Sequence, residues 1–188
     1  MSRKLIVSEF VSLDGVMEAP GGEPGYPHSG WVFDFMSPEQ ESYKLAETLE
    51  SETLLLGRVT YEGFSAAWPE RGGEFADKMN AMPKLVASTT LSELEWNNST
   101  VIDGNVPDAI SQLKQSDGGP ILVAGSCTLV HSLLEHDLVD ELRLMVFPVA
   151  LGSGLRVFPE TDRKTVLALA ETKAFDSGVV VNTYHRAS

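Results

Sequence analysis

The feature that most constrains this chain is a short apolar strand that passes directly into a helix. Leu54, Leu55 and Leu56 have the pattern of a buried strand, and Gly57 and Arg58 follow where a helical pattern begins. In open α/β sheets, ligands bind where the carboxyl ends of strands face helix amino termini. Free backbone N–H groups there favour an anion, and a guanidinium can hold a phosphate through two hydrogen bonds. The segment alone leaves open whether Arg58 is a phosphate anchor or an ordinary surface arginine.

The rest of the chain repeats this alternation of strand and helix patterns. The expected strands lie at residues 4–12, 53–57, 84–88, 100–102 and 120–124. The expected helices begin at the capping box of Ser37 and Gln40, at Arg58, near residue 74, after Asn105 and after Ser126. The Gly/Pro-rich segment 14–30 can be neither helix nor central strand and is typical of a lid or binding loop.

The last quarter of the chain has a different pattern. Residues 139–149 form a long apolar run, and Asp176-Ser177-Gly178 is a tight hairpin signal between two further strands. The whole pattern predicts one α/β domain over residues 1–188. We expect a three-layer α/β/α arrangement in which a mixed, mostly parallel central sheet ends in a C-terminal antiparallel hairpin.

Composition excludes several classes of partner. The formal net charge is −13, so neither nucleic acid nor an anionic membrane is an expected partner. No apolar run approaches the ~20 residues that cross a bilayer, and the first residues pass straight into a strand pattern rather than a signal peptide. The single cysteine, Cys127, fits a reducing cytoplasm, and packing is its expected role because no base partner is evident. The four histidines are scattered, and we expect no metal site.

Three expected strands end in the same way. Each ends in glycine or in residues with a hydroxyl side chain, at one edge of a parallel sheet. The segments are Leu56-Gly57-Arg58, Ala87-Ser88-Thr89 and Ala124-Gly125-Ser126. Together these favour a nucleotide site, because phosphates need close backbone approach and hydrogen-bond donors. The chain contains neither G-x-x-x-x-G-K-[ST] nor G-x-G-x-x-G, so the common nucleotide motifs do not apply.

Several blocks in the same order resemble a known family. They are Ser12-Leu13-Asp14-Gly15, the run Leu55-Leu56-Gly57-Arg58-Val59-Thr60-Tyr61-Glu62, Val86-Ala87-Ser88-Thr89, Val123-Ala124-Gly125-Ser126, Val139-Asp140-Glu141-Leu142-Arg143, and Pro148-Val149-Ala150-Leu151-Gly152-Ser153-Gly154. As a set, spanning nearly the whole chain, they are similar to the dihydrofolate reductase fold, in the reductase-domain branch shared with bacterial riboflavin biosynthesis. The resemblance implies an NADPH-dependent reductase of a pteridine-like or aminopyrimidine-like heterocycle.

The resemblance also implies roles for individual residues. Gly57, Arg58 and Thr60 would hold the phosphates and adenosine side of NADPH. Ser88 and Thr89 would lie with Arg58 on the 2′-phosphate, and Gly125, Ser126, Cys127 and Thr128 would line the pyrophosphate. Asp14, Gly15 and Val16 would border the nicotinamide and the substrate. Trp31 would close that pocket, with Phe35 and Tyr61 also on the substrate side.

Reduction also requires a proton for the reduced atom. Asp14 and Asp34 are the candidate acids, and Asp14 before Gly15 is equally typical of a turn. Two alternatives remain open. One is a non-catalytic nucleotide- or pterin-binding protein. The other is an interaction module on the same fold, whose strand at 139–149 would build a homodimer, and a homodimer is compatible with the enzyme as well.

Overall fold

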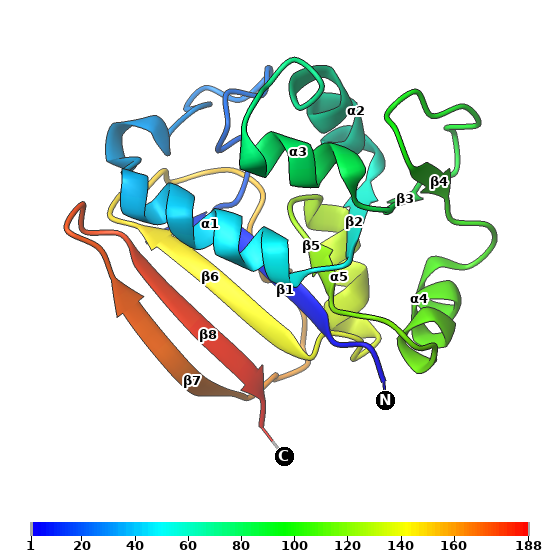
Figure 1. The fold of residues 1–188 in the computed structure, drawn as a ribbon. Coiled ribbons are helices and arrows are strands. Elements are labelled where there is room, and N and C mark those ends of the chain that lie inside the picture. Colours follow the sequence, from blue (N-terminus) through cyan, green and yellow to red (C-terminus); the bar gives the residue numbers. More distant parts are fainter. Residues whose placement is uncertain (1, 188) are drawn as a thin grey trace.

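A computed structural model describes residues 2–187 as one eight-stranded sheet with helices on both faces (Figure 1). The strands are β1 (Leu5–Ser12), β2 (Thr53–Gly57), β3 (Lys84–Ala87), β4 (Ser99–Val101), β5 (Ile121–Val123), β6 (Glu141–Phe147), β7 (Leu167–Ala174) and β8 (Val180–Arg186). The helices are the short 3₁₀ helix η1 (Phe33–Phe35), α1 (Pro38–Glu50), α2 (Arg58–Ala67), α3 (Glu74–Ala81), α4 (Val106–Gln115) and α5 (Cys127–Glu135).

The sheet is mixed, with the order β4-β3-β2-β5-β1-β6-β8-β7. The strands from β4 to β6 pair in parallel, and β6, β8 and β7 pair antiparallel. This confirms the predicted three-layer fold and the C-terminal hairpin. Because β2, β5 and β1 are neighbours and parallel, their carboxyl ends lie at the same edge of the sheet.

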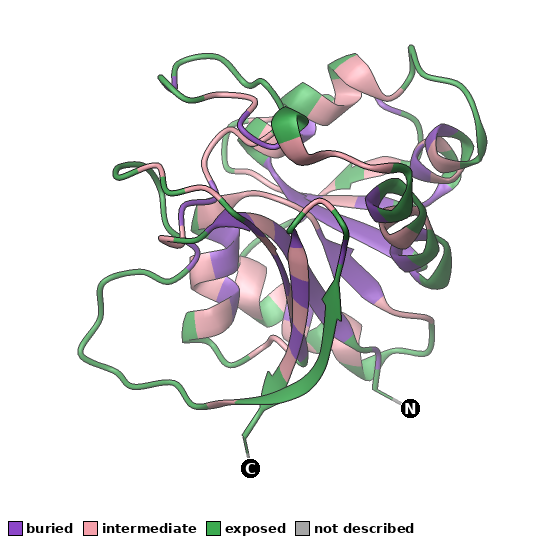
Figure 2. Cartoon of the chain, turned by 90° about the vertical axis from the view of Figure 1, so that its left-hand side faces the viewer, coloured by how far each residue is buried: buried purple, intermediate pink, exposed green. Residues whose placement is uncertain are grey.

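The two faces of the sheet are covered by different helices. One core contains Leu55 of β2, Val123 of β5, Ile110 of α4 and Leu133 of α5. The opposite face has a core that joins β2 and β3 to α2 and α3, and a second one that joins β6 and β8 to segment 16–32 and to Tyr43 of α1. Figure 2 shows the central strands buried and β7 exposed. Burial on both faces explains why β2 is a continuous apolar run rather than an alternating one.

Local capping signals are confirmed where the sequence placed them. The Ser37 hydroxyl accepts a hydrogen bond from the Gln40 backbone, and the Gln40 side chain accepts one from the Ser37 backbone, which closes the predicted capping box of α1. Asn105 caps α4 by accepting from the Asp108 N–H, with proline in the first turn. Both motifs involve only a few neighbouring residues, so they are readable without knowledge of the fold.

The segment 14–30, predicted as a lid or binding loop, is tied down in this structure. The Trp31 indole donates to the Glu18 carbonyl at 2.8 Å, and the Tyr26 hydroxyl donates to the Ser153 carbonyl at 2.6 Å. An isolated bridge pairs Val16 with Arg156. The loop and the segment 151–156 therefore form one packed layer beyond the end of β1.

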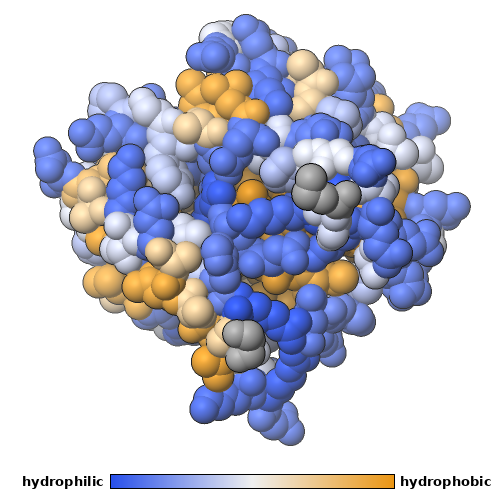
Figure 3. Space-filling model, turned by 60° about the horizontal axis from the view of Figure 1, so that its bottom comes forward, coloured by the Kyte–Doolittle hydropathy of each residue, from blue (hydrophilic) through white to orange (hydrophobic). Residues whose placement is uncertain are grey.

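The strand on which the interaction-module alternative relied is not available for pairing. Strand β6 lies inside the sheet between β1 and β8, so it cannot build a dimer through its edge. The sheet edges are β4 and β7, and β7 carries Lys173 and a register shift between Leu169 and Glu171. Lysine and a bulge are features that discourage edge pairing. The face shown in Figure 3 is mainly hydrophilic, with apolar side chains in separate patches.

Buried charges join α1 to the sheet. Glu47 is 2% exposed and is paired with Lys44 on the same helix and with Arg143 on β6. Arg143 also pairs with Glu141, whose pKa falls to about 2 although burial alone would raise it, because Lys4 and Arg143 donate to its carboxylate. The pairs satisfy one another, so this network fixes the position of α1 over the sheet.

Candidate functional site

The ends of β2 and β5 are joined by a chain of hydrogen bonds. The Gly57 backbone N–H donates to Ser126 Oγ at 2.7 Å, and the Ser126 hydroxyl donates to Thr60 Oγ1 at 2.7 Å. Gly125 lies against the same threonine. The structure thus brings four of the predicted cofactor residues into one cluster at the expected edge of the sheet, which we call the strand-end cluster: Gly57, Thr60, Gly125 and Ser126.

Both glycines of the strand-end cluster are required by close packing. A Cβ at position 57 would lie 2.6 Å from Ser126 Oγ, and one at position 125 would lie 2.9 Å from Thr60 Cγ2. Gly125 has φ +82° and Ser126 has φ +74°, so a non-glycine residue occupies the left-handed region as the N-cap of α5. Backbone strain of this kind clusters at ligand sites, and the turn leads directly into the N–H groups of a helix.

Arg58 lies beside the strand-end cluster but is engaged within its own helix. Its Nη1 donates to Glu62 Oε1 at 3.1 Å and to Oε2 at 3.0 Å, and about half of each side chain is exposed. Ser88 uses its hydroxyl as an acceptor for the N–H groups of Thr90 and Leu91, and Thr89 is exposed. Within residues 2–187 no hydrogen bond joins Arg58 to Ser88 or Thr89, so these three are neighbours of the site and not a preformed cluster.

Cys127 has a partner that the sequence analysis overlooked. Its Sγ lies 3.4 Å from His131 Nε2, one helical turn along α5, and the thiol also donates to the Arg156 carbonyl at 3.4 Å. The same His131 Nε2 donates to the Arg156 carbonyl at 2.8 Å, so this nitrogen carries a hydrogen and is not a base toward the thiol. Burial, reinforced by the charges of Glu9 and Glu18, raises the pKa of the thiol to about 11. The thiol stays protonated at neutral pH, and Thr128, next on α5, is exposed.

Asp14 anchors the backbone of the segment 151–152. Its carboxylate accepts from the Ser12 hydroxyl at 2.6 Å and from the N–H groups of Leu151 at 3.0 Å and Gly152 at 2.8 Å. The Ser12 hydroxyl and then the Leu151 N–H hold the pKa of Asp14 well below its ordinary value. A carboxylate that is ionised at neutral pH has no proton to give, so these hydrogen bonds favour an anchoring role for Asp14, and its role as the acid stays untested. Asp34, the other candidate, is exposed on η1.

Three residues predicted on the substrate side are parts of the core. Val16, Trp31 and Tyr61 are 0%, 6% and 4% exposed. Trp31 packs edge-on against Phe147 at 5.3 Å, and the Tyr61 hydroxyl accepts from the Trp96 backbone at 3.1 Å. All three side chains serve the packing of the core in this structure, and their contact with a substrate stays a prediction. Gly15 forms the turn after β1 with φ +83°, and Phe35 is half-buried against the core that contains Phe147.

Glu9 is a site residue that the sequence analysis missed. It lies on β1, is 5% exposed, and accepts from the Gly125 N–H at 3.0 Å and 3.1 Å through its two carboxyl oxygens. Burial raises its pKa to about 8, although Gly125 and Lys44 act in the opposite direction. The sequence did contain a signal for this residue. The α/β alternation places the strand of Glu9 at the centre of the sheet, where both faces are covered, so a glutamate there is expected to be buried.

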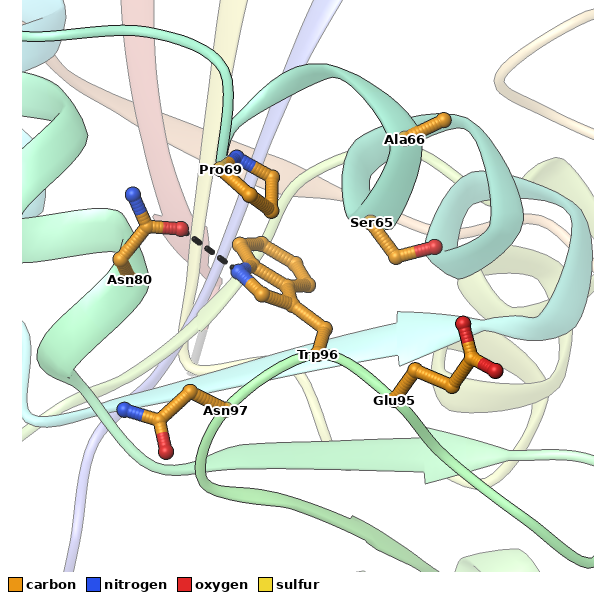
Figure 4. Close-up of a pocket in the computed structure, with 7 residues that line it drawn as sticks. All are labelled: Ser65, Ala66, Pro69, Asn80, Glu95, Trp96 and Asn97. Atoms are coloured by element: carbon orange, nitrogen blue, oxygen red, sulfur yellow. Dashed lines mark hydrogen bonds between the residues drawn. The ribbon is translucent and has the colours of Figure 1, made fainter.

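A hollow of about 590 Å³ lies elsewhere, between α2, α3 and the segment before β4 (Figure 4). Trp96 forms its floor and donates to Asn80 at 2.7 Å. Its α2 residues, Ser65 and Ala66, lie at the opposite end of the helix from Arg58. Since the rise is about 1.5 Å per residue, roughly 10 Å separates them along the helix axis. This hollow is therefore distinct from the strand-end cluster.

The fold belongs to a known structural class. The chain is similar in structure to a candidate riboflavin biosynthesis protein from Shewanella sp. PV-4, with a TM-score of 0.75 and 22% identity over 100% of both chains. It is also similar to dihydrofolate reductase from Enterococcus faecalis, in a complex with NADP(H) and RAB-propyl, with a TM-score of 0.65 and 18% identity over 100% of both chains. These likenesses define a dihydrofolate reductase-like fold.

The sequence itself identifies the family. Residues 3–181 match the RibD C-terminal domain, and the chain belongs to this family. Two relatives from Bacillus subtilis (strain 168) are the uncharacterized proteins YyaP and YwjB. YyaP is 28% identical over 97% of this chain and 95% of its own length, and YwjB is 30% identical over 100% of both. The resemblance stated from the sequence blocks is thereby confirmed.

Within residues 2–187, no helix is both long and apolar enough to cross a membrane. In the same residues, no three histidine, cysteine, aspartate or glutamate side chains are grouped so that they could hold a metal ion.

Proposed function

We propose that this protein is an NADPH-dependent reductase that transfers a hydride to a small flat heterocycle of the pteridine or aminopyrimidine kind. The observation that carries the proposal is the strand-end cluster, in which Gly57, Thr60, Gly125 and Ser126 pack together before the N-terminus of α5. Membership of the RibD C-terminal family and the dihydrofolate reductase-like fold support it.

The residues around the strand-end cluster suit the phosphates of a dinucleotide. We place the pyrophosphate at the Gly125–Ser126 turn, where the first N–H groups of α5, from Cys127 and Thr128, are free of intrahelical partners. Arg58 would hold the 2′-phosphate by exchanging Glu62 for it, with Ser88 and Thr89 nearby. A phosphate dianion at Arg58 is what distinguishes NADPH from NADH.

The bound cofactor supplies the hydride, so the protein has to orient the two rings and exclude water. The tethered loop 14–30 and the half-buried Phe35 would form the substrate side, with the turn at Gly15. Asp14 contributes by fixing the segment 151–152 against that turn. Since Asp14 is ionised, the proton comes from another group or from water.

Turnover tests the proposal directly. The full chain is mixed with NADPH and a panel of oxidised pterins and aminopyrimidines, and loss of the reduced nicotinamide absorbance is followed. Oxidation that depends on both the protein and one heterocycle is expected. Binding of NADPH without oxidation across the panel would instead favour the non-catalytic binding protein, and absence of NADPH binding would overturn the NADPH-dependent reductase.

A further inference from the structure

A buried carboxyl group contacts the turn that the proposed function assigns to the pyrophosphate. Glu9 projects from β1 toward β5, and its two oxygens share the N–H of Gly125 at 3.0 Å and 3.1 Å. Within residues 2–187 this N–H is its only hydrogen-bond partner, and Glu9 takes part in no ion pair there. A fully buried glutamate without a cation is uncommon, because an isolated carboxylate is costly to remove from water.

The charged and titratable groups around Glu9 come from α1 and α5. Lys44 and Glu47 act on it from α1, but Lys44 is already paired with Glu47 and bonded to Ser8 at 2.8 Å. Cys127 of α5 is also close, because the negative charges of Glu9 and Glu18 both raise the pKa of the Cys127 thiol. His131 lies next to this thiol. None of these groups neutralises Glu9, whose pKa burial raises to about 8.

A neutral carboxyl has one O–H donor, and the Gly125 N–H, itself a donor, cannot accept it. The one hydrogen-bond partner of Glu9 in residues 2–187 therefore leaves this donor unused. An acceptor-rich ligand at the turn would accept its hydrogen bond, whereas an ionised Glu9 would repel an anion at the same place.

We propose that Glu9 is a further ligand-binding residue of this site, whose neutral carboxyl donates a hydrogen bond to the dinucleotide held at the Gly125–Ser126 turn. The inference rests on the proposed function. It predicts that binding of the dinucleotide is coupled to retention or uptake of a proton by Glu9.

The test is the pH dependence of NADPH affinity, measured on the full chain by fluorescence titration between pH 7 and 9.5 at constant ionic strength. For the unmodified protein, Kd should be constant near pH 7 and should rise toward tenfold per pH unit above about pH 8. Glu9→Gln keeps an acceptor for Gly125 and a donor for the ligand but does not titrate. Its Kd should be within a few-fold of the unmodified value at pH 7 and should stay constant to pH 9.5.

Glu70→Gln is the matched control, because it makes the same change of charge at an exposed carboxyl group and should keep the pH dependence of the unmodified protein. Lys84, whose pKa burial lowers to about 8, titrates in the same range but is present in every variant. The difference between Glu9→Gln and the unmodified protein therefore isolates Glu9.

Proton uptake tests the same coupling without a substitution. Calorimetric titration of the unmodified protein with NADPH at pH 8.5, in buffers of different ionisation enthalpy, should show uptake of more than half a proton per NADPH. Zero uptake, or a Kd with the same pH profile in Glu9→Gln as in the unmodified protein, would overturn the role of Glu9 alone. If NADPH fails to bind at every pH, the proposed function fails, and this inference fails with it.

Discussion

The backbone N–H of Gly57 donates a 2.7 Å hydrogen bond to Ser126 Oγ, which fastens the end of β2 to the turn after β5. The two residues are 69 positions apart in the sequence. This contact fixes the spacing of the two helix N-termini, α2 and α5, on which the proposed cofactor site depends.

Gly57→Ala should therefore destabilise the protein. The new methyl group would lie 2.6 Å from Ser126 Oγ, and overpacking of this kind costs about 1–3 kcal/mol. Gly63→Ala, in the same helix region but with open space around it, should instead stabilise by up to about 1 kcal/mol. Urea denaturation of both variants checks the prediction. Equal effects at the two positions would show that the contact is not tight.

Glu62 is predicted to compete with the cofactor for Arg58. Glu62→Gln frees the guanidinium, and since an exposed i,i+4 pair is worth about 0.2–1 kcal/mol, NADPH affinity should rise by up to about fivefold. Glu70→Gln makes the same change of net charge farther along the chain and should leave Kd unchanged. An equal gain in both variants would reveal a general charge effect, and a loss in Glu62→Gln would make Glu62 a ligand contact.

Glu9 is predicted to make folding stability depend on pH. Its pKa is raised from 4.5 to about 8 in the folded protein, so the stability it contributes is present below pH 4.5 and is lost as the pH rises through about 8. The free energy of unfolding should fall relative to that of Glu9→Gln by up to about 1.4 kcal/mol per pH unit within this window. Urea titrations at several pH values measure it. A constant difference between the two proteins would contradict a buried neutral Glu9.

Asp14→Asn should lower the free energy of unfolding and not only the rate of turnover. Loss of the charge weakens the hydrogen bonds from Ser12, Leu151 and Gly152, which should cost about 1 kcal/mol at pH 7. Because the folded pKa is lowered, this contribution is present above the ordinary pKa of aspartate and is lost as the pH falls below it. Thermal unfolding at neutral and acidic pH checks the sign. Unchanged stability with turnover reduced by about 10²–10⁴-fold would restore Asp14 as the acid.

The predictions from sequence succeeded where a few adjacent residues decide the outcome. The capping box at Ser37 and the hairpin at Asp176-Ser177-Gly178 are local, and the strand-end glycines follow from the parallel order. The burial of Trp31 and Tyr61 was not predicted, because an aromatic residue beside a glycine-rich loop or at a helix start looks the same whether it faces a ligand or the core. Glu9 was missed because its burial and its bond to Gly125 depend on which strand lies beside β1.

The most direct test of the account is the difference between NADPH and NADH in thermal unfolding of the unmodified protein and of Arg58→Ala. At a concentration about 100 times Kd, bound NADPH should stabilise by about 2.7 kcal/mol and raise Tm by about 5–10 °C. NADH should raise Tm less than NADPH does, and Arg58→Ala should remove most of this difference between the two cofactors. Arg71 stacks on Trp68 instead, so Arg71→Ala should keep the difference. Equal Tm shifts from NADPH and NADH in the unmodified protein would contradict the assignment of Arg58 to the 2′-phosphate.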